Sequence, residues 1–250
     1  MLDNISIGKY YDIKSIIHKL NAFIKLICLI LILIISFIVV NPICLIFIFI
    51  FVLLNMFLSN VPLKYYLKSV LMMKYLLIFI VIINLILGSS MWIIINNLLQ
   101  LMIVVLSSSI MAYTTKQNDL LYALECLFSP LKIIGIKPKK ISFILSMAFR
   151  FIPDILVNAD KIIKSQSCRG IDYHNGSFKE KLMALKAMIL PLIVNSFRRA
   201  NMVATTMEIR LYDVNNSISY KKGKFKFYDF YYLFLHILLS LLLVVKEVWL

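Results

Sequence analysis

The fold is decided by the stretch LICLILILIISFIVV-NP-ICLIFIFIFVLLNMFL, residues 26–58. It contains most of one apolar run, Ala22–Val40, and all of a second, Ile43–Leu58, with only Asn41-Pro42 between them. A helix that crosses a bilayer needs about 20 mostly apolar residues. Proline lacks an N–H group and restricts the residue before it, so the first helix must end here. Two apolar runs joined by so short a turn predict a transmembrane hairpin.

Three further apolar runs follow, at Val70–Leu87, Met91–Tyr113 and Phe230–Val245, with Gly88-Ser89-Ser90 separating the first two of them. The run Met91–Tyr113 is the weakest, because it contains Asn, Gln and Ser residues. The sequence therefore predicts an all-α integral membrane protein with about five transmembrane helices. The polar residues in the weak run are Asn96, Asn97, Gln100 and Ser107–Ser109.

The composition supports a membrane protein and excludes an ordinary soluble enzyme. Hydrophobic residues make up 62% of the chain, against about 45–50% in a typical soluble domain. The mean hydropathy is +0.91, yet the formal charge is 27 − 12 = +15. No CxxC pair or His–Cys cluster is present, so the cysteines predict free thiols rather than a disulfide framework or a zinc site. These cysteines are Cys28, Cys44, Cys126 and Cys168.

Basic residues near the spans predict the orientation, because cytoplasmic loops carry an excess of Lys and Arg. Lysines precede the first span and occupy the connection between the second and third, whereas the other two short turns have none. The N-terminus and the segment 114–228 are therefore expected in the cytoplasm, and the C-terminus outside. This segment has 19 of the 27 basic and 8 of the 12 acidic residues, a net charge of 19 − 8 = +11. The lysines that set the pattern are Lys9, Lys14, Lys19, Lys25, Lys64, Lys68 and Lys74.

The predicted organisation has four parts. Two long helices are expected in the cytoplasmic part, at about 138–168 and 178–209. Each contains a proline, Pro153 or Pro191, followed by a similar phrase (PDILVN and PLIVN), and each has an arginine close to its end. This similarity suggests, as a hypothesis, a structural repeat. The four parts are a cytoplasmic N-terminus (1–21), a four-helix transmembrane region (22–113), a cytoplasmic domain that contains the two long helices (114–228) and a last transmembrane helix (229–250).

Motifs of catalysis are absent from the sequence. There is no GxxxxGK[ST], HExxH or GxSxG pattern, and the histidines His18, His174 and His236 are isolated, so no catalytic, cofactor-binding or metal-binding residue is predicted. An arginine near a helix C-terminus is favoured by the helix dipole and can pair with a carboxylate through its planar fork. Basic amphipathic helices are equally typical of a surface that lies on anionic lipid. From the residues alone, partner docking and lipid binding remain two open hypotheses.

The stretch SMAFRFIPDILVNADKIIKSQSCRGIDY (146–173) resembles the signature region of the transmembrane T component of energy-coupling factor (ECF) transporters. The family's first coupling motif, usually Ala-Arg-Gly, appears here as Cys168-Arg169-Gly170. The second, near a Met-x-Ala-Arg phrase, appears as Glu208-Ile209-Arg210-Leu211, which keeps the arginine but not its small neighbours. The stretch 18–26 also resembles the family's Leu-Asp-Pro-Arg-x-Lys-Leu, with Asp-Pro-Arg replaced. The matching residues of the signature region are Arg150, Ile152, Pro153, Ala159, Gln166, Arg169 and Gly170.

The resemblance implies a non-catalytic subunit of an ABC importer in the plasma membrane of a prokaryote. Two cytoplasmic ATPases and a substrate-binding membrane S component are its implied partners, and a vitamin or metal ion is the implied cargo. Each arginine motif would dock on one ATPase, and apolar residues near Pro153 and Pro191 would contact the S component. The alternative is a membrane-anchored scaffold that uses its basic helices on anionic lipid. No nucleic-acid partner is predicted, because the orientation rule already explains the positive charge. The expected ATPase-docking residues are Cys168, Arg169, Gly170, Ile209, Arg210 and Leu211, with Arg150, Pro153, Gln166 and Pro191 in support.

Overall fold

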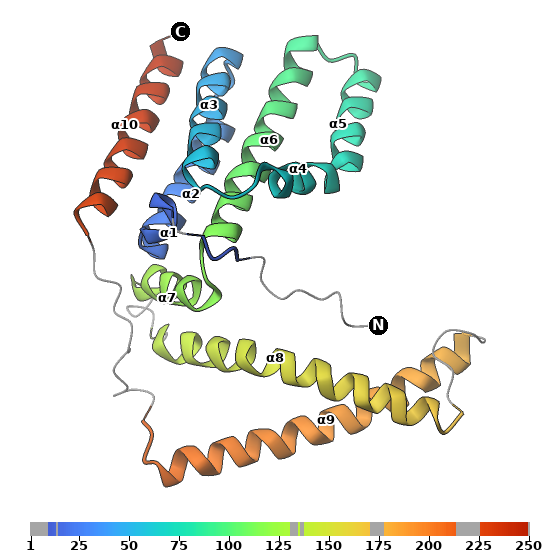
Figure 1. Ribbon diagram of the computed structural model, residues 1–250. Coiled ribbons are helices and arrows are strands. Elements are labelled where there is room, and N and C mark those ends of the chain that lie inside the picture. The colour runs from blue at the N-terminus through green and yellow to red at the C-terminus, as the bar shows by residue number, and fades with distance from the viewer. Residues whose placement is uncertain are drawn as a thin grey trace. The chain divides into compact units, whose positions relative to one another are not determined.

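The computed structural model describes residues 10–13, 15–130, 135, 138–170, 178–213 and 226–249. In these residues the regular structure is entirely helical, which confirms the predicted all-α class (Figure 1). The chain forms two compact units. One comprises the described parts of 8–127 and 221–250, and the other those of 128–220.

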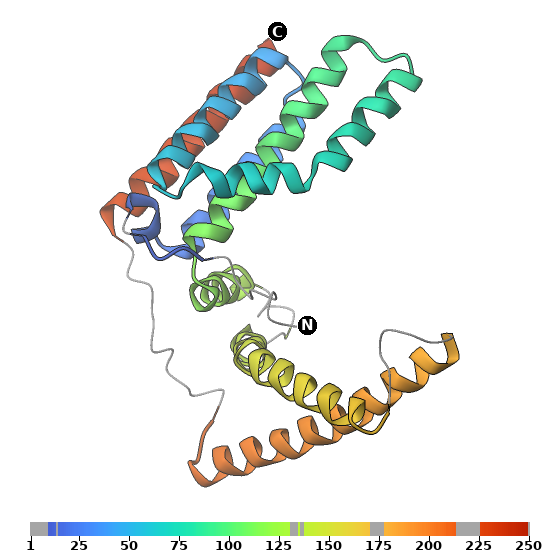
Figure 2. The ribbon, with the colours of Figure 1, turned by 45° about the vertical axis from the view of Figure 1, so that its right-hand side comes forward.

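The first unit is a helical bundle. Helix α6 contacts α2, α3, α4 and α5, and α10 packs on α2 (Figures 1 and 2). The last helix of the chain thus joins a bundle built mainly from its first half. The helices of this unit are α1 (Ile16–Lys19), α2 (Ala22–Ile38), α3 (Pro42–Leu58), α4 (Leu63–Met72), α5 (Lys74–Ile86), α6 (Met91–Thr114), α7 (Gln117–Leu127) and α10 (Phe227–Trp249).

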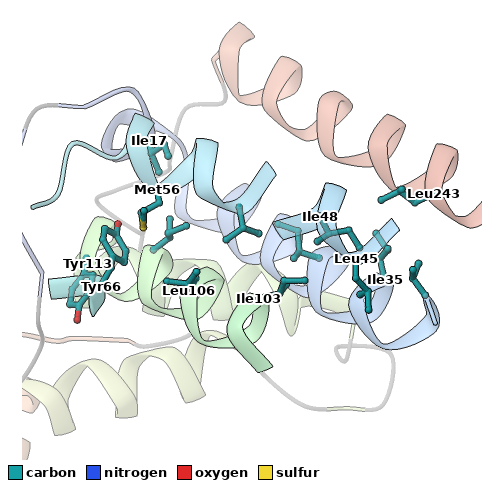
Figure 3. Close-up of a cluster of buried hydrophobic side chains, with 14 of the residues drawn as sticks. Ile17, Ile35, Leu45, Ile48, Met56, Tyr66, Ile103, Leu106, Tyr113 and Leu243 are labelled. Carbon is teal, nitrogen blue, oxygen red and sulfur yellow. The ribbon is translucent and has the colours of Figure 1, made fainter. Parts of the chain in front are cut away.

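The predicted hairpin is present as α2 and α3. Asn21 caps α2, because its side-chain oxygen accepts a hydrogen bond from the Phe23 N–H at 3.1 Å. Pro42 is the first residue of α3, where the missing N–H costs no helical bond. The interior face of the hairpin joins a core of buried aliphatic and aromatic side chains that includes Leu45 and Ile103 (Figure 3).

The outer face of α3 is also apolar. Phe47, Ile50 and Leu54 are 54%, 48% and 56% exposed. Exposure of such a surface to water is unfavourable, whereas lipid tails solvate it. Helices that are apolar on all sides are therefore typical of membrane spans. An exposed apolar face of this kind is suited to contact with lipid.

The predicted third span at Val70–Leu87 is not one straight helix. The region forms two helices, α4 and α5, which meet at Met73 with a bend of 49°. The 13 residues of α5 are only about 20 Å long, short of a hydrocarbon core of about 30 Å. Two hydrogen bonds between hydroxyl groups hold α4 beside the break, one to Ser59 directly after α3 and one to Tyr113 of α6. These are Tyr66 with Ser59 at 2.8 Å and Ser69 with Tyr113 at 2.6 Å.

The predicted fourth span, Met91–Tyr113, is present as one continuous helix, α6. Some of its polar residues bond neighbouring helices or its own backbone. Asn97 donates to the side-chain oxygen of Asn84 on α5 at 3.3 Å, and the Ser107 hydroxyl bonds the carbonyl of Ile103. Asn97 and Ser107, which made this run look weak in the sequence, thus take part in internal contacts.

Length and apolarity identify three described helices that could cross a membrane: Met91–Thr114, Lys140–Ser167 and Phe227–Glu247. The bent pair α4–α5 could be a fourth span, and α2 and α3, at 17 residues each, are shorter apolar helices. The segment Lys140–Ser167 was not predicted as a span.

The second unit contains two long helices, α8 (Pro138–Ser167) and α9 (Phe178–Ile209), as expected from the sequence. They run in opposite directions and pack against each other (Figure 1). Both continue through their internal prolines. Each contributes one buried alanine, Ala159 or Ala184, and such small side chains allow two helices to approach closely. The loop predicted after Gly170 lies at 171–177, outside the described residues.

Candidate functional site

The predicted docking residues lie at the C-terminal ends of the two long helices. Cys168, Arg169 and Gly170 directly follow α8, while Ile209 is the last residue of α9 and Arg210 and Leu211 follow it. All six are exposed, and Cys168 is a free thiol. These side chains are therefore accessible on the isolated chain.

The two helix ends have the same backbone design. At the first, the Gly170 N–H donates to the Ser167 carbonyl at 3.0 Å, and Gly170 has a φ of +86°. At the second, the Leu211 N–H donates to the Glu208 carbonyl at 2.9 Å, and Leu211 has a φ of +49°. A left-handed residue directly after the last turn is a common way to end a helix. In both cases the arginine is the residue just before the chain turns away.

The side chains around the two arginines differ. Glycine adopts a left-handed conformation without strain, whereas a residue with a Cβ pays roughly 1–2 kcal/mol. Leu211 nevertheless occupies this position and is 91% exposed, and Ile209 is 76% exposed. The first end thus presents small groups beside its arginine, and the second presents two large aliphatic ones.

The two ends lie far apart. The ring of Tyr212, two residues after Arg210, stacks on Phe143 near the start of α8, with centroids 5.5 Å apart and planes at 29°. Arg169 lies beyond the opposite end of α8, and 169 − 143 = 26 residues at about 1.5 Å each give a separation of about 40 Å. The predicted site is therefore two separate clusters.

An ion pair between the two helices was not predicted from the sequence. Arg199 of α9 contacts the Asp154 carboxylate of α8 at 2.8 Å, and its guanidinium lies 5.4 Å from the centre of the Phe151 ring. The pattern of a single helix does not reveal such a pair, because the partners are 45 residues apart (199 − 154). The pair fixes where α8 and α9 meet.

The supporting motif residues lie along the same helices. Gln166 is half-buried, and its carbonyl accepts the Arg169 N–H at 3.0 Å, so it belongs to the cap itself. Arg150 and Pro153 are exposed, and Pro191 is half-buried. No cluster of metal-binding side chains occurs in the described part of the chain.

The bundle contains charged side chains that the sequence analysis placed elsewhere or did not identify. Lys25 was expected before the first span, but it lies in α2, is 7% exposed and donates to the Thr114 carbonyl at 3.0 Å. Asp229, in the first turn of α10, is fully buried and accepts the N–H groups of Asn21 at 2.9 Å and Lys226 at 2.8 Å. His236 is buried, and its ring centre lies 4.8 Å from that of Phe51.

The opposite end of α10 is also held by a carboxylate. Glu247 accepts the N–H groups of Val40 and Asn41, at 3.0 and 3.2 Å, and the side-chain amide of Asn41 at 3.1 Å. These contacts attach α10 to the turn of the α2–α3 hairpin.

A polar cluster around His18 lies just before helix α2. The His18 Nε2 lies 2.9 Å from the Tyr11 carbonyl, which can only accept, and its Nδ1 lies 2.6 Å from the Ser15 hydroxyl. The neutral ring, with its proton on Nε2, satisfies both contacts. Burial lowers the pKa of His18 below its ordinary value of 6.5, because desolvation disfavours the charged ring.

Comparison with known proteins gives consistent matches. The CbiQ family model, described as "Cobalt transport protein", matches residues 13–220. The "Energy-coupling factor transporter transmembrane protein EcfT" of Brevibacillus brevis is 33% identical over 228 residues, covering 85% of this chain and 86% of that protein. Proteins of the same name from Staphylococcus aureus and Ruminiclostridium cellulolyticum are 29% and 28% identical over 246 and 227 residues, covering 92% and 85% of each chain.

Proposed function

The chain belongs to the CbiQ cobalt transport protein family, and from this premise we propose that it is the coupling subunit of an ECF-type importer. In this role Arg169 and Arg210 each dock on one cytoplasmic ATPase. The long helices transmit the ATP-driven motion to a substrate-binding S component, which imports a vitamin or a metal ion. The chain itself catalyses no reaction.

The observation that carries the proposal is the pair of exposed arginine caps about 40 Å apart at opposite ends of one packed helix pair. A single small ligand cannot bridge that distance, whereas two protein subunits side by side can. The planar guanidinium can form two parallel hydrogen bonds with a carboxylate, which suits a fixed docking contact.

The surroundings of each arginine define what the partner must offer. Cys168 and Gly170 are small, so a partner backbone can approach Arg169 closely. Ile209 and Leu211 are large and exposed, so the groove for Arg210 needs an apolar lining that removes them from water.

Exposed apolar side chains on α8 and α9 provide the surface for the S component. Contiguous exposed apolar patches mark interaction sites. The most exposed of these residues between the two caps are Ile144, Val157, Met183, Leu190, Phe197 and Met202, each at least 53% exposed.

The orientation follows from charge. We place the N-terminus and the segment 114–228 in the cytoplasm and the C-terminus outside, in the plasma membrane of a prokaryote, because the lysines and arginines concentrate on those segments. We place α8 outside the hydrocarbon, although Lys140–Ser167 is long and apolar enough to span it. Arg150, Asp154 and Asp160 occupy its middle, and charged residues at that depth are costly.

Affinity purification tests the proposal. The tagged chain is co-expressed with its neighbouring ATPases and S component, and ATPase recovery is measured for Arg169→Glu, Arg210→Glu and the double variant. Each single change should weaken recovery and the double change should abolish it. Arg198→Glu is the matched control, because Arg198 is exposed on α9 away from both caps.

Full ATPase recovery with the double variant would refute the docking assignment. If the chain instead floats with acidic vesicles and ignores the ATPases, the lipid-bound scaffold is correct. Reconstituted alone in liposomes, the chain should neither hydrolyse ATP nor take up substrate.

A further inference from the structure

A small cavity lies within the helical bundle, and its mostly apolar lining includes a few polar side chains. Its volume is about 30 Å³, and its lining comes from α1, α2, α3, α6 and α10. One water molecule needs about 10–15 Å³ measured in this way, so the cavity has room for about two. Polar groups on its wall include those of Lys25, Asn55, Ser107, Tyr232 and His236.

Most of these polar groups already have partners. The Tyr232 hydroxyl donates to the Asn55 side-chain oxygen at 3.0 Å, and the Asn55 amide donates to the Phe51 carbonyl at 3.1 Å. The Ser107 hydroxyl bonds the Ile103 carbonyl. These side chains therefore have hydrogen-bond partners within the protein.

Two nitrogen atoms of the lining residues can form hydrogen bonds beyond those that they make in the described part of the chain. The Nδ1 of His236 lies 2.9 Å from the Tyr232 carbonyl, which can only accept, so Nδ1 carries a proton. In the neutral ring the lone pair is then on Nε2, which is buried and has no partner among the described residues. The Lys25 ammonium has three N–H groups, of which one bonds the Thr114 carbonyl.

The chemistry of these two groups selects the ligand. A cation would be repelled by the Lys25 ammonium, and an anion would meet the lone pair on His236 Nε2. Water accepts a hydrogen bond from the ammonium and donates one to Nε2, so it satisfies both. Buried water with two or more polar partners is a regular part of protein structures.

We propose that this cavity binds water that bridges the Lys25 ammonium to His236 Nε2 and so connects α2 with α10 inside the membrane. The site joins the third turn of α10 to the first turn of α2. It requires no partner protein, so it stands or falls independently of the transport role.

Ring-¹⁵N-labelled histidine tests the proposal in the full chain, purified into lipid nanodiscs. The chain has three histidines, and the variants His18→Gln and His174→Gln assign the remaining signal to His236. Nε2 should resonate as a hydrogen-bonded acceptor and receive magnetisation from water. A free acceptor without water transfer, or direct coupling to a ¹⁵N-labelled lysine, would overturn the proposal.

Two variants sharpen the result. Lys25→Met keeps the length of the side chain but removes the ammonium, and it should lower the water-to-ring transfer about twofold or more, since the water loses one of its two anchors. Ser107→Ala is the matched control, because its hydroxyl bonds the helix backbone and should leave the transfer unchanged. Equal water-to-ring magnetisation transfer in Lys25→Met and the wild type would show that Lys25 does not hold the water. The measurement on the unmodified chain does not depend on the folding of either variant.

Discussion

The buried carboxylate of Asp229 provides a quantitative test of how α10 is attached. It is fully buried and accepts two backbone N–H groups, from Lys226 directly before α10 and from Asn21 directly before α2. Hydrogen bonds to a charged group contribute about 1.5–3 kcal/mol each. Asp229→Asn keeps one oxygen but turns an NH₂ group toward the other donor, so it should cost about 2 kcal/mol. Asp229→Ala leaves both donors unpaired and should cost about 4 kcal/mol.

Thermal unfolding of the detergent-solubilised chain measures these losses. A thiol-reactive dye reports unfolding, because Cys28 and Cys44 are buried and become reactive only when the bundle opens. For a chain of this size about 1 kcal/mol corresponds to 2–4 °C, so Asp229→Asn should lower Tm by about 4–8 °C. Asp12→Asn is the matched control, because that side chain is 84% exposed and 4.0 Å from Lys116. If Asp229→Asn and Asp12→Asn unfold at the same temperature, the carboxylate does not attach α10.

Three further predictions concern the helix ends, the helix pair and the N-terminal cluster. Leu211→Gly should raise the free energy of unfolding by about 1 kcal/mol, because it removes the strain of the left-handed conformation, and it should weaken ATPase recovery. Leu211→Ala should weaken ATPase recovery without that gain in Tm. ATPase recovery at the wild-type level with both variants would contradict an apolar contact at Leu211. Reversing either charge of the Asp154–Arg199 pair should broaden the distance between spin labels on α8 and α9, and exchanging both charges should restore it; stability should change by at most about 1 kcal/mol, since the pair is half-exposed. The His18 pKa is lowered by burial, so the unfolded chain binds the proton more readily. Stability should be full above about pH 6.5 and fall as the pH drops through the folded-state pKa, a slope that His18→Gln should remove.

Much of the fold could be predicted because the bilayer imposes long apolar runs with few exceptions. The hairpin break at Pro42, the ends of α8 and α9 and the last helix all follow from local pattern and turn chemistry. The bend at Met73 could not be predicted, since nothing in that apolar run interrupts a helix. The hydroxyl contacts that hold α4 beside the bend include one between distant segments, from Ser69 to Tyr113 of α6, which the pattern of the run does not reveal.

The candidate site was located by the resemblance around Arg169 and Arg210, and the structure adds how their backbones end. Sequence spacing placed the arginines near helix ends, but the left-handed conformation of Leu211 is not expected of a leucine. The partner of Asp154 could not be identified either, because pairing across two helices depends on their crossing point. The burial of Lys25 could not be predicted, because the sequence pattern of a lysine near the start of an apolar run is the same whether its side chain faces the lipid headgroups or the bundle interior.

The three polar attachments of α10 also specify its register. Asp229 meets the start of α2, Tyr232 meets Asn55 of α3, and Glu247 meets the hairpin turn at Asn41. Lipid tails are as apolar as the helix itself, so apolar contacts alone would let α10 slide at little cost. A slip of one helical turn, about 5.4 Å, would break all three attachments together. The polar groups therefore define one position along the bundle for a helix that is separated from the other helices of the bundle by the whole segment 128–220.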